Sequence, residues 1–169
     1  MSAPALAILS LGSNLGDRER NIREAVADLA AVPGIEVLAT SGLVETAALK
    51  PQGVDDSAPA YLNAIAQVST TLEPSALLEA TARIEQGHGR VRAERWGDRT
   101  LDIDIITFGA LQQHDERLTL PHPRAHERAF VLVPWLQVDA DATLPGIGRI
   151  DLLPSAVADV RRYPAEALS

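Results

Sequence analysis

The chain has 169 residues, of which 46% are hydrophobic and 22% are charged, and its formal net charge is −8. A chain of this length fits one folded domain, and its composition is unlike that of a disordered or fibrous protein. The negative charge argues against a broad surface for nucleic acid or anionic membrane, because both are polyanions. The absence of cysteine excludes a disulfide framework and a thiolate metal site.

The N-terminal residues show no pattern of export or membrane insertion. Residues 1–11 lack a basic segment followed by a long apolar run, and no stretch approaches the roughly 18 apolar residues that span a bilayer. We therefore expect a single domain over residues 1–169 that acts in the cytoplasm and binds neither nucleic acid nor membrane.

The first third of the chain is predicted to form a strand, a helix and a second strand. Residues 5–11 are a short apolar run followed by a glycine-containing turn motif, which is typical of a buried strand. Apolar residues then recur at helical spacing between a cap at Asp17 and a stop at Pro33. Residues 35–44 alternate well enough for a strand, whereas residues 45–59 show no period and predict a long functional loop.

The middle of the chain repeats this order. Residues 62–70 alternate as a strand, and a helix follows from Pro74 to about Gly87. A polar, arginine-rich stretch leads to another strand at residues 101–108, after which we expect a turn or hairpin, a short helix at 125–133 and an irregular tail. The resulting order predicts an α+β fold with a ferredoxin-like βαββαβ core and a mostly antiparallel sheet.

The most informative motif is Asp102-Ile103-Asp104 in the last core strand. Residues two apart in a strand share a face, so both carboxylates lie on one side while Leu101, Ile103 and Ile105 lie on the other. Two carboxylates about 7 Å apart at the backbone suit Mg²⁺, which completes its shell with water and substrate phosphates. A solvated acidic face of a half-buried strand is the alternative for such a pair taken alone.

Four of the fourteen arginines, Arg90, Arg92, Arg95 and Arg99, precede this pair within a dozen residues. Guanidinium groups bind phosphate oxygens in bidentate fashion, so arginines beside metal-binding carboxylates indicate a polyphosphate clamp. A surface network in which Glu94 and Asp98 neutralise the arginines explains the same residues, and composition alone does not decide between the two.

Three further motifs are candidates for binding. His122 and His126 could contact phosphate or metal, or be ordinary loop histidines. Tyr61 and Asn63 place a ring and a carboxamide on one strand face, which suits a flat heterocycle but also ordinary strand packing. The run from Gly12 to Gly16 lacks the lysine and serine spacing of a Walker loop, and turn chemistry suffices to explain it.

Together these motifs resemble the 6-hydroxymethyl-7,8-dihydropterin pyrophosphokinase family. The similarity extends over roughly residues 8–138 in the family's order, and its Arg-Trp-Gly to Asp-x-Asp block is highly specific. The matching motifs are Leu11-Gly12-Ser13-Asn14-Leu15-Gly16, Tyr61-Leu62-Asn63-Ala64, Ile84-Glu85 with Gly89-Arg90-Val91-Arg92, Arg95-Trp96-Gly97-Asp98-Arg99-Thr100-Leu101-Asp102-Ile103-Asp104, and Leu120-Pro121-His122-Pro123-Arg124.

The resemblance implies transfer of a diphosphate from ATP to the hydroxymethyl group of the pterin in folate biosynthesis, with AMP released. Asp102 and Asp104 would hold two Mg²⁺ ions, and Arg90 and Arg99 would act on the phosphates in catalysis. The residues implied to bind ATP are Glu85, Arg92, Trp96, Ile105, Arg117, Thr119, His122 and Arg128. Those implied to bind the pterin are Thr46, Leu49, Tyr61, Asn63 and Phe130.

The resemblance also implies that residues 45–59 and 87–99 are loops that close over the small-molecule substrates, ATP and the reduced pterin. Two alternative functions remain to be distinguished by experiment. One is another Asp-x-Asp metal-dependent nucleotidyl or glycosyl transferase, and the other is a non-catalytic ferredoxin-like module that binds a ligand.

Overall fold

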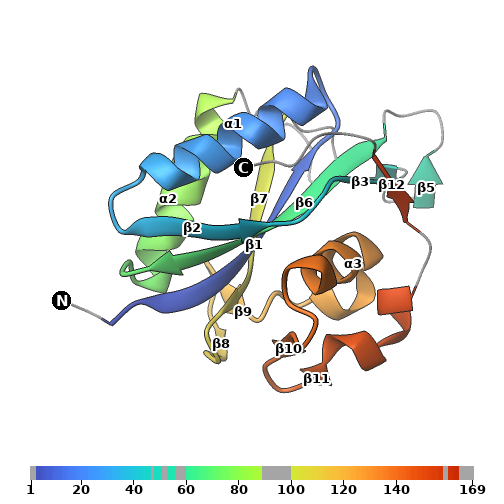
Figure 1. Ribbon diagram of the computed structural model, residues 1–169. Helices are drawn as coiled ribbons and strands as arrows, with labels where there is room; N and C mark the ends of the chain where they lie inside the picture. Colours follow the sequence, from blue (N-terminus) through green and yellow to red (C-terminus); the bar gives the residue numbers. More distant parts are fainter. Residues whose placement is uncertain are drawn as a thin grey trace.

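The computed structural model describes residues 3–46, 48–50, 53–55, 60–88, 100–157 and 160–163, with backbone only for 48–50 and 53–55. An antiparallel sheet forms the middle layer, with α1 (Arg18–Ala31) and α2 (Pro74–Gly87) on one face. The third helix, α3 (Ala129–Val138), and the elements that follow it as far as Val157 lie on the side of the other face (Figure 1). None of the described helices combines the length and the apolar character that crossing a bilayer requires.

The core strands are β1 (Ala5–Ser13), β2 (Ile35–Thr40), β6 (Tyr61–Thr70) and β7 (Asp102–Phe108). They lie in the order β7-β1-β6-β2, and each pairs with its neighbour in antiparallel fashion. With α1 after β1 and α2 after β6, this is the predicted ferredoxin-like βαββαβ arrangement, and the prediction of the fold is confirmed.

The strand predicted at residues 35–44 is broken in two. Both β2 and the short β3 (Val44–Thr46) pair with the same edge of β6, with residues 41–43 between them. At the break, the Ser41 backbone N–H donates to the Ile65 carbonyl (2.9 Å), and the Ser41 hydroxyl accepts from the Ile65 N–H (2.8 Å). A side chain thus takes over one hydrogen bond of the ladder, which periodicity cannot show.

The absence of regular structure predicted for residues 45–59 was wrong for part of that segment. Its first residues belong to β3, and β4 (Ala48–Lys50) pairs with β5 (Gly53–Asp55) in a small antiparallel ribbon. Such a ribbon is held by backbone hydrogen bonds, so it needs no apolar alternation. The remaining short elements are β8 (Gln113–His114), β9 (Thr119–Leu120), the 3₁₀ turn Ala125–Glu127, β10 (Thr143–Leu144), β11 (Gly148–Arg149), the 3₁₀ turns Ile150–Leu152 and Pro154–Val157, and β12 (Arg161–Arg162).

Local signals explain both helices that cover the sheet. The Asp17 carboxylate accepts from the Arg20 N–H (3.1 Å) as an N-cap of α1, and Pro74 occupies the first turn of α2, where its missing N–H is no loss. Their apolar faces pack with alternate residues of β1, β6 and β7 in the larger core cluster, which includes Ile22, Leu29, Leu77 and Ile84.

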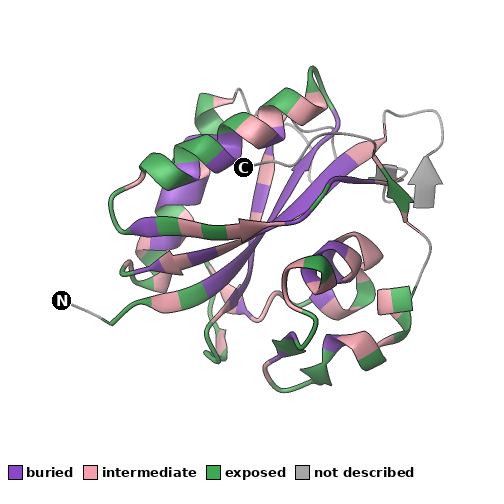
Figure 2. Cartoon of the chain, in the orientation of Figure 1, coloured by how far each residue is buried: buried purple, intermediate pink, exposed green. Residues whose placement is uncertain are grey.

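A second core lies on the opposite face of the sheet. Ile8, Ile65 and Ile106 project there from three strands and pack with Val131, Leu132 and Trp135 of α3 and neighbouring residues. Strand β6 is therefore buried on both faces along part of its length, as Figure 2 shows. The helix predicted at 125–133 is a 3₁₀ turn followed by α3, which extends to Val138.

Candidate active site

Toward the end of β1, the sheet face that carries the second core becomes polar. In the register of the sheet, Gly12 of β1 lies opposite Asn63 of β6 on one side and Asp102 of β7 on the other. Directly opposed residues share a face, so these three form a row across three strands. Two strand spacings separate the outer members by roughly 10 Å at the backbone. Two residues earlier in β1, and therefore on the same face, Ser10 lies opposite Asp104.

Gly12, at the centre of this row, lets the Asn63 side chain approach the backbone of β1 closely. A Cβ atom placed on it would stand 2.9 Å from the Asn63 Oδ1 and 3.6 Å from the Tyr61 ring. Gly12 lies within β1, which continues to Ser13, so the interpretation of this residue as part of a turn was wrong. The sequence signal for its role was its place two residues after Ser10, on the same face of the strand, and it was missed because glycine usually marks a turn.

The two carboxylates lie as the alternation predicted. Asp102 and Asp104 are partly exposed on the polar face, whereas Leu101, Ile103 and Ile105 are buried in the core on the helix side. Within the described residues, His, Cys, Asp and Glu side chains form no group of three or more that could enclose a metal. A pair of carboxylates is nevertheless the donor set that Mg²⁺ takes when phosphates and water complete its shell, so these residues fit that metal.

Cationic and aromatic side chains surround Asp104. Its Oδ2 lies 3.8 Å from the Arg128 Nη1 and 4.0 Å from the His122 Nε2. The Arg128 guanidinium carbon also lies 5.5 Å from the centre of the Phe130 ring, a cation–π arrangement. Arg128 therefore connects the carboxylate side of the site with the aromatic ring at the start of α3.

Burial tunes the charges in this cluster. It lowers the pKa of His122 to about 4, and the charge of Arg128 acts in the same direction. His122 is therefore neutral near pH 7 and offers a hydrogen bond rather than a positive charge. Burial also lowers the pKa of Arg128, although the Asp104 carboxylate opposes that change.

Three of the residues expected to bind the pterin meet at the β3–β6 edge. Thr46 lies opposite Tyr61, and the Asn63 Nδ2 lies 3.4 Å from the Thr46 Oγ1, at the long end of the hydrogen-bond range. Asn63 is buried, with 4% of its surface exposed. Phe130 approaches from α3, and Leu49 lies in β4, where only the backbone is described.

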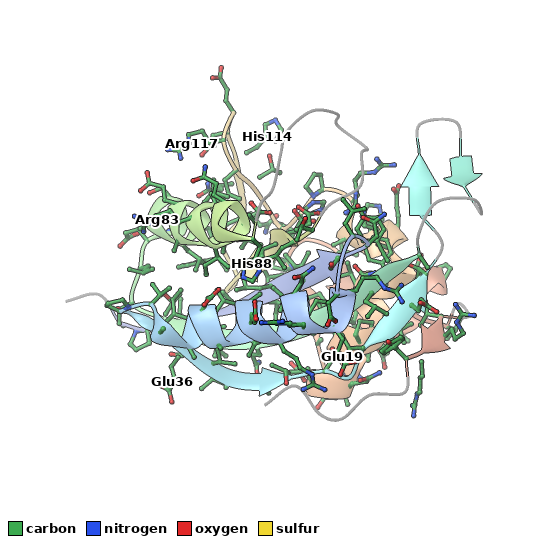
Figure 3. The ribbon with its side chains drawn as sticks, turned by 90° about the horizontal axis from the view of Figure 1, so that it is seen from above. Glu19, Glu36, Arg83, His88, His114 and Arg117 are labelled. Atoms are coloured by element: carbon green, nitrogen blue, oxygen red, sulfur yellow. The ribbon has the colours of Figure 1, made fainter. Side chains whose placement is uncertain are left out.

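The residues expected to bind ATP divide into two groups. His122 and Arg128 lie beside Asp104, as described above. Arg117 and Thr119 lie on or next to the β8–β9 hairpin, which extends past α2 and carries the exposed Arg117 side chain (Figure 3). Arg117 lines a hollow there with Leu78, Gln113 and other residues of α2 and the hairpin.

Glu85 and Ile105, also expected to bind ATP, have buried side chains. Glu85 accepts a hydrogen bond from the Ile103 N–H (2.8 Å), and Ile105 packs in the core on the helix side. The Glu85 carboxylate thus satisfies an outward-facing N–H of β7 between the two aspartates. The structure gives both residues a part in fixing β7.

Four of the predicted site residues, Arg90, Arg92, Trp96 and Arg99, lie outside the described residues. The structure also brings forward a residue that sequence reasoning missed. The Asn21 amide of α1 donates to the carbonyls of Leu15 (3.0 Å) and Thr100 (3.2 Å), which ties the turn after β1 to the start of β7. Its partner Thr100 is 79 residues away, so no local pattern could indicate it.

Comparison with known proteins decides the family. Residues 8–140 match the family model described as 7,8-dihydro-6-hydroxymethylpterin-pyrophosphokinase. The chain belongs to this pyrophosphokinase family. The expectation from the motifs is thereby confirmed, over nearly the range that they covered.

Curated relatives and solved structures agree with the assignment to the pyrophosphokinase family. A 2-amino-4-hydroxy-6-hydroxymethyldihydropteridine pyrophosphokinase of Methylorubrum extorquens is 44% identical over 140 residues, covering 83% of this chain and 86% of the relative. One of Mycobacterium leprae with the same name is 41% identical over 172 aligned positions, covering 95% of this chain and 86% of the relative.

A solved structure supports the fold alone. The crystal structure of wild-type Plasmodium falciparum HPPK-DHPS with pteroate superposes with a TM-score of 0.67 at 15% identity. The match covers 89% of this chain and 42% of that one, so the present chain spans less than half of the larger protein.

Proposed function

We propose that this protein transfers a diphosphate group from ATP to the hydroxymethyl group of 6-hydroxymethyl-7,8-dihydropterin and releases AMP, as a step of folate biosynthesis. Membership of the pyrophosphokinase family supports this reaction. The structural observation that carries it is the row of Asn63, Gly12 and Asp102, which places a carboxamide and a carboxylate pair on one face of the sheet, on either side of a residue without a side chain. A small heterocycle bound at one end would reach phosphates held at the other.

On the heterocycle side, Asn63 would read the edge of the pterin by hydrogen bonds, beside Thr46 and Tyr61. Phe130 would stack on its ring, and Leu49 would contribute from β4. The order of the strands supports this division, because β1 separates β3 and β6 from β7, which carries the carboxylates. Buried polar groups of this kind select strongly for a ligand that can pair with them.

On the nucleotide side, Asp102 and Asp104 would hold two Mg²⁺ ions. When bound, Mg²⁺ would neutralise charge on the phosphate oxygens and align them. ATP would be bound by Glu85, Arg92, Trp96, Ile105, Arg117, Thr119, His122 and Arg128, and Arg90 and Arg99 would engage the transferring group. Because the side chains of Glu85 and Ile105 are buried, their contribution would come through the position of β7 and its backbone.

In the reaction, the pterin hydroxyl oxygen forms a bond to the β-phosphorus as the bond from that phosphorus to the oxygen bridging to the α-phosphorus breaks. The electron pair leaves with AMP, and the hydroxyl proton passes to solvent. Charge develops on phosphate oxygens, so the contribution of the chain is to position the substrates and to surround that charge with cations. Arg128 can do both, because it contacts Phe130 as well as Asp104.

The direct experiment is to mix the protein with ATP, Mg²⁺ and the reduced pterin and to identify the products. We expect AMP and the diphosphorylated pterin. Another nucleotidyl or glycosyl transferase would release pyrophosphate or a nucleoside diphosphate instead, and a non-catalytic binding module would release neither. We place the reaction in the cytoplasm, where ATP is available.

A second experiment addresses the division of the site. Asn63→Ala and Phe130→Ala should each weaken pterin binding and leave ATP affinity nearly unchanged, because both side chains lie on the heterocycle side. Calorimetric titration of each ligand separately would measure this. Equal losses for both ligands would show that the pocket is assigned wrongly or that the variant is misfolded.

A further inference from the structure

The strand β12 is added to the outer edge of the main sheet by residues that follow the family match. Arg161 lies opposite Glu45 and Arg162 opposite Val44, so β12 pairs in antiparallel fashion with β3. The Tyr163 N–H then donates to the Leu43 carbonyl (3.0 Å). Figure 1 shows β12 beside β3, at the edge of the sheet where Thr46 also lies.

Side chains reinforce this backbone pairing around Glu45. The Arg18 Nη1 donates to one carboxylate oxygen of Glu45 (2.8 Å), and the Arg161 Nη2 donates to the other. The Glu45 side chain is only 13% exposed. Burial alone would raise the pKa of Glu45, but the hydrogen bond from Arg18 and the charges of both arginines outweigh burial and lower it. The group is therefore ionised at neutral pH.

Arg18 holds two separate parts of the pterin side at once. Besides Glu45, which precedes Thr46, its Nη1 donates to the carbonyl of Ala60 (2.7 Å), which precedes Tyr61. The guanidinium carbon also lies 5.7 Å from the centre of the Tyr163 ring, a cation–π contact between Arg18 and the residue after β12. Glu45 and Ala60, the residues just before Thr46 and Tyr61, are thus bound to one cation, which Tyr163 of the tail contacts in turn.

We propose that Arg18, Glu45 and Arg161, with Tyr163, form a tail clamp that positions Thr46 and Tyr61 for the pterin. These are positioning residues of the heterocycle side, and the C-terminal strand is part of that half of the site. The expected effect on pterin binding rests on the proposed function. The clamp itself is a property of the chain and can be measured without any ligand.

Geometry limits the clamp to one substrate. Its members contact β3, the start of β6 and the N-terminal end of α1, whereas Asp102 and Asp104 lie on β7, separated from β3 by β6 and β1. Loss of the clamp should therefore loosen Thr46 and Tyr61 and leave the carboxylate pair in place. A merely stabilising contact would lower the melting temperature and affect both substrates alike.

The test compares three full-length variants. Arg161→Ala removes one partner of Glu45, Arg161→Lys keeps a positive charge, and Arg162→Ala is the matched control, since the structure shows the neighbouring Arg162 as an exposed side chain whose backbone makes the β3 pairing. Arg161 is largely exposed, so its loss should cost no more than a surface ion pair does, which corresponds to about a two- to fivefold rise in pterin Kd. Arg161→Lys should recover part of the lost pterin affinity. Arg162→Ala should change the pterin Kd by less than about twofold, and the ATP Kd should change by less than about twofold in all three variants.

Backbone hydrogen exchange supplies the readout that needs no ligand. In Arg161→Ala, amides of Val44–Thr46 and of the start of β6 should exchange faster, whereas those of β7 should keep their protection. Unchanged exchange at β3 overturns the clamp whether or not the protein binds a pterin. Faster exchange with an unchanged pterin Kd, or with equal losses of pterin and ATP binding, overturns the positioning role. Faster exchange in a protein that makes no AMP supports the clamp and refutes the proposed reaction.

Discussion

The close approach of Asn63 to Gly12 gives the sharpest prediction about the site. Gly12→Ala should be tolerated by the backbone, because Gly12 lies in a regular strand and no left-handed φ is present there. Replacing glycine in a strand by alanine even reduces the entropy lost on folding. The new methyl group, however, would stand 2.9 Å from the Asn63 Oδ1, which is closer than real Cβ contacts allow. The carboxamide is the part that can move, so it would turn away from its position.

The expected loss can be estimated from what that carboxamide would do. A displaced Asn63 can no longer offer its hydrogen bonds to a pterin edge, and an unmade hydrogen bond in a buried place costs about 1–3 kcal/mol. We therefore expect the pterin Kd to rise by about 5- to 150-fold. ATP binding should remain within about twofold, because the carboxylates lie on the other neighbouring strand. The free energy of unfolding should change by less than about 1 kcal/mol.

Calorimetric titration with each ligand, combined with a double-mutant cycle, would decide the matter. If Gly12→Ala acts by displacing Asn63, then adding it to Asn63→Ala should cost little more, because the two remaining neighbours, the Tyr61 ring at 3.6 Å and the Leu62 carbonyl at 3.8 Å, lie at ordinary contact distances. Additive losses in the double variant, or an unchanged pterin Kd in Gly12→Ala, would refute the reasoning.

Five other substitutions address the carboxylates, the arginines and the strand that carries the carboxylates. Asp102→Asn and Asp104→Asn should abolish turnover and leave the fold intact, because a neutral amide holds Mg²⁺ poorly; near-normal activity at saturating Mg²⁺ would contradict the metal assignment. Arg90→Ala and Arg99→Ala should slow single turnover by about a hundredfold or more with a much smaller loss of ATP affinity, and proportional losses in rapid-quench and binding measurements would make them plain nucleotide anchors. Glu85→Ala should lower the free energy of unfolding in urea by about 1–3 kcal/mol, because it leaves the Ile103 N–H without that acceptor, and an unchanged midpoint would show that water replaces the carboxylate.

The fold followed from the sequence because its main elements have strong local signals. Apolar residues recur with the helical period in α1 and α2, and the alternation around Asp102 and Asp104 fixed which side of β7 is polar. Periodicity reports faces of an element, however, and not its edges. The break after Thr40 and the pairing of β3 with β12 are edge properties, set by partners elsewhere in the chain.

The residues of the candidate site that form a motif in the sequence were predictable. Those that matter through contacts with distant parts of the chain were not. Asp102 and Asp104 are recognisable because they are neighbours in sequence. Glu45 was not singled out, because Arg18 is 27 residues away and Arg161 is 116 residues away. Gly12 was missed for a related reason, since the meaning of a glycine in a strand depends on the side chain that occupies the space beside it.

The polar part and the apolar part of the sheet face that α3 covers depend on each other through this helix. Ile65 and Asn63 are two residues apart in β6 and therefore share a face, so the packing of Ile65 against α3 also fixes the part of the strand that carries the carboxamide. The same helix begins just after Arg128 and includes Phe130. The packing of Val131, Leu132 and Trp135 in the second core therefore also fixes the start of α3, which carries Phe130. The positions of Asn63 and Phe130 consequently depend on one apolar cluster. Rigid packing of this kind suits a reaction in which the chain contributes mainly by holding two substrates in line.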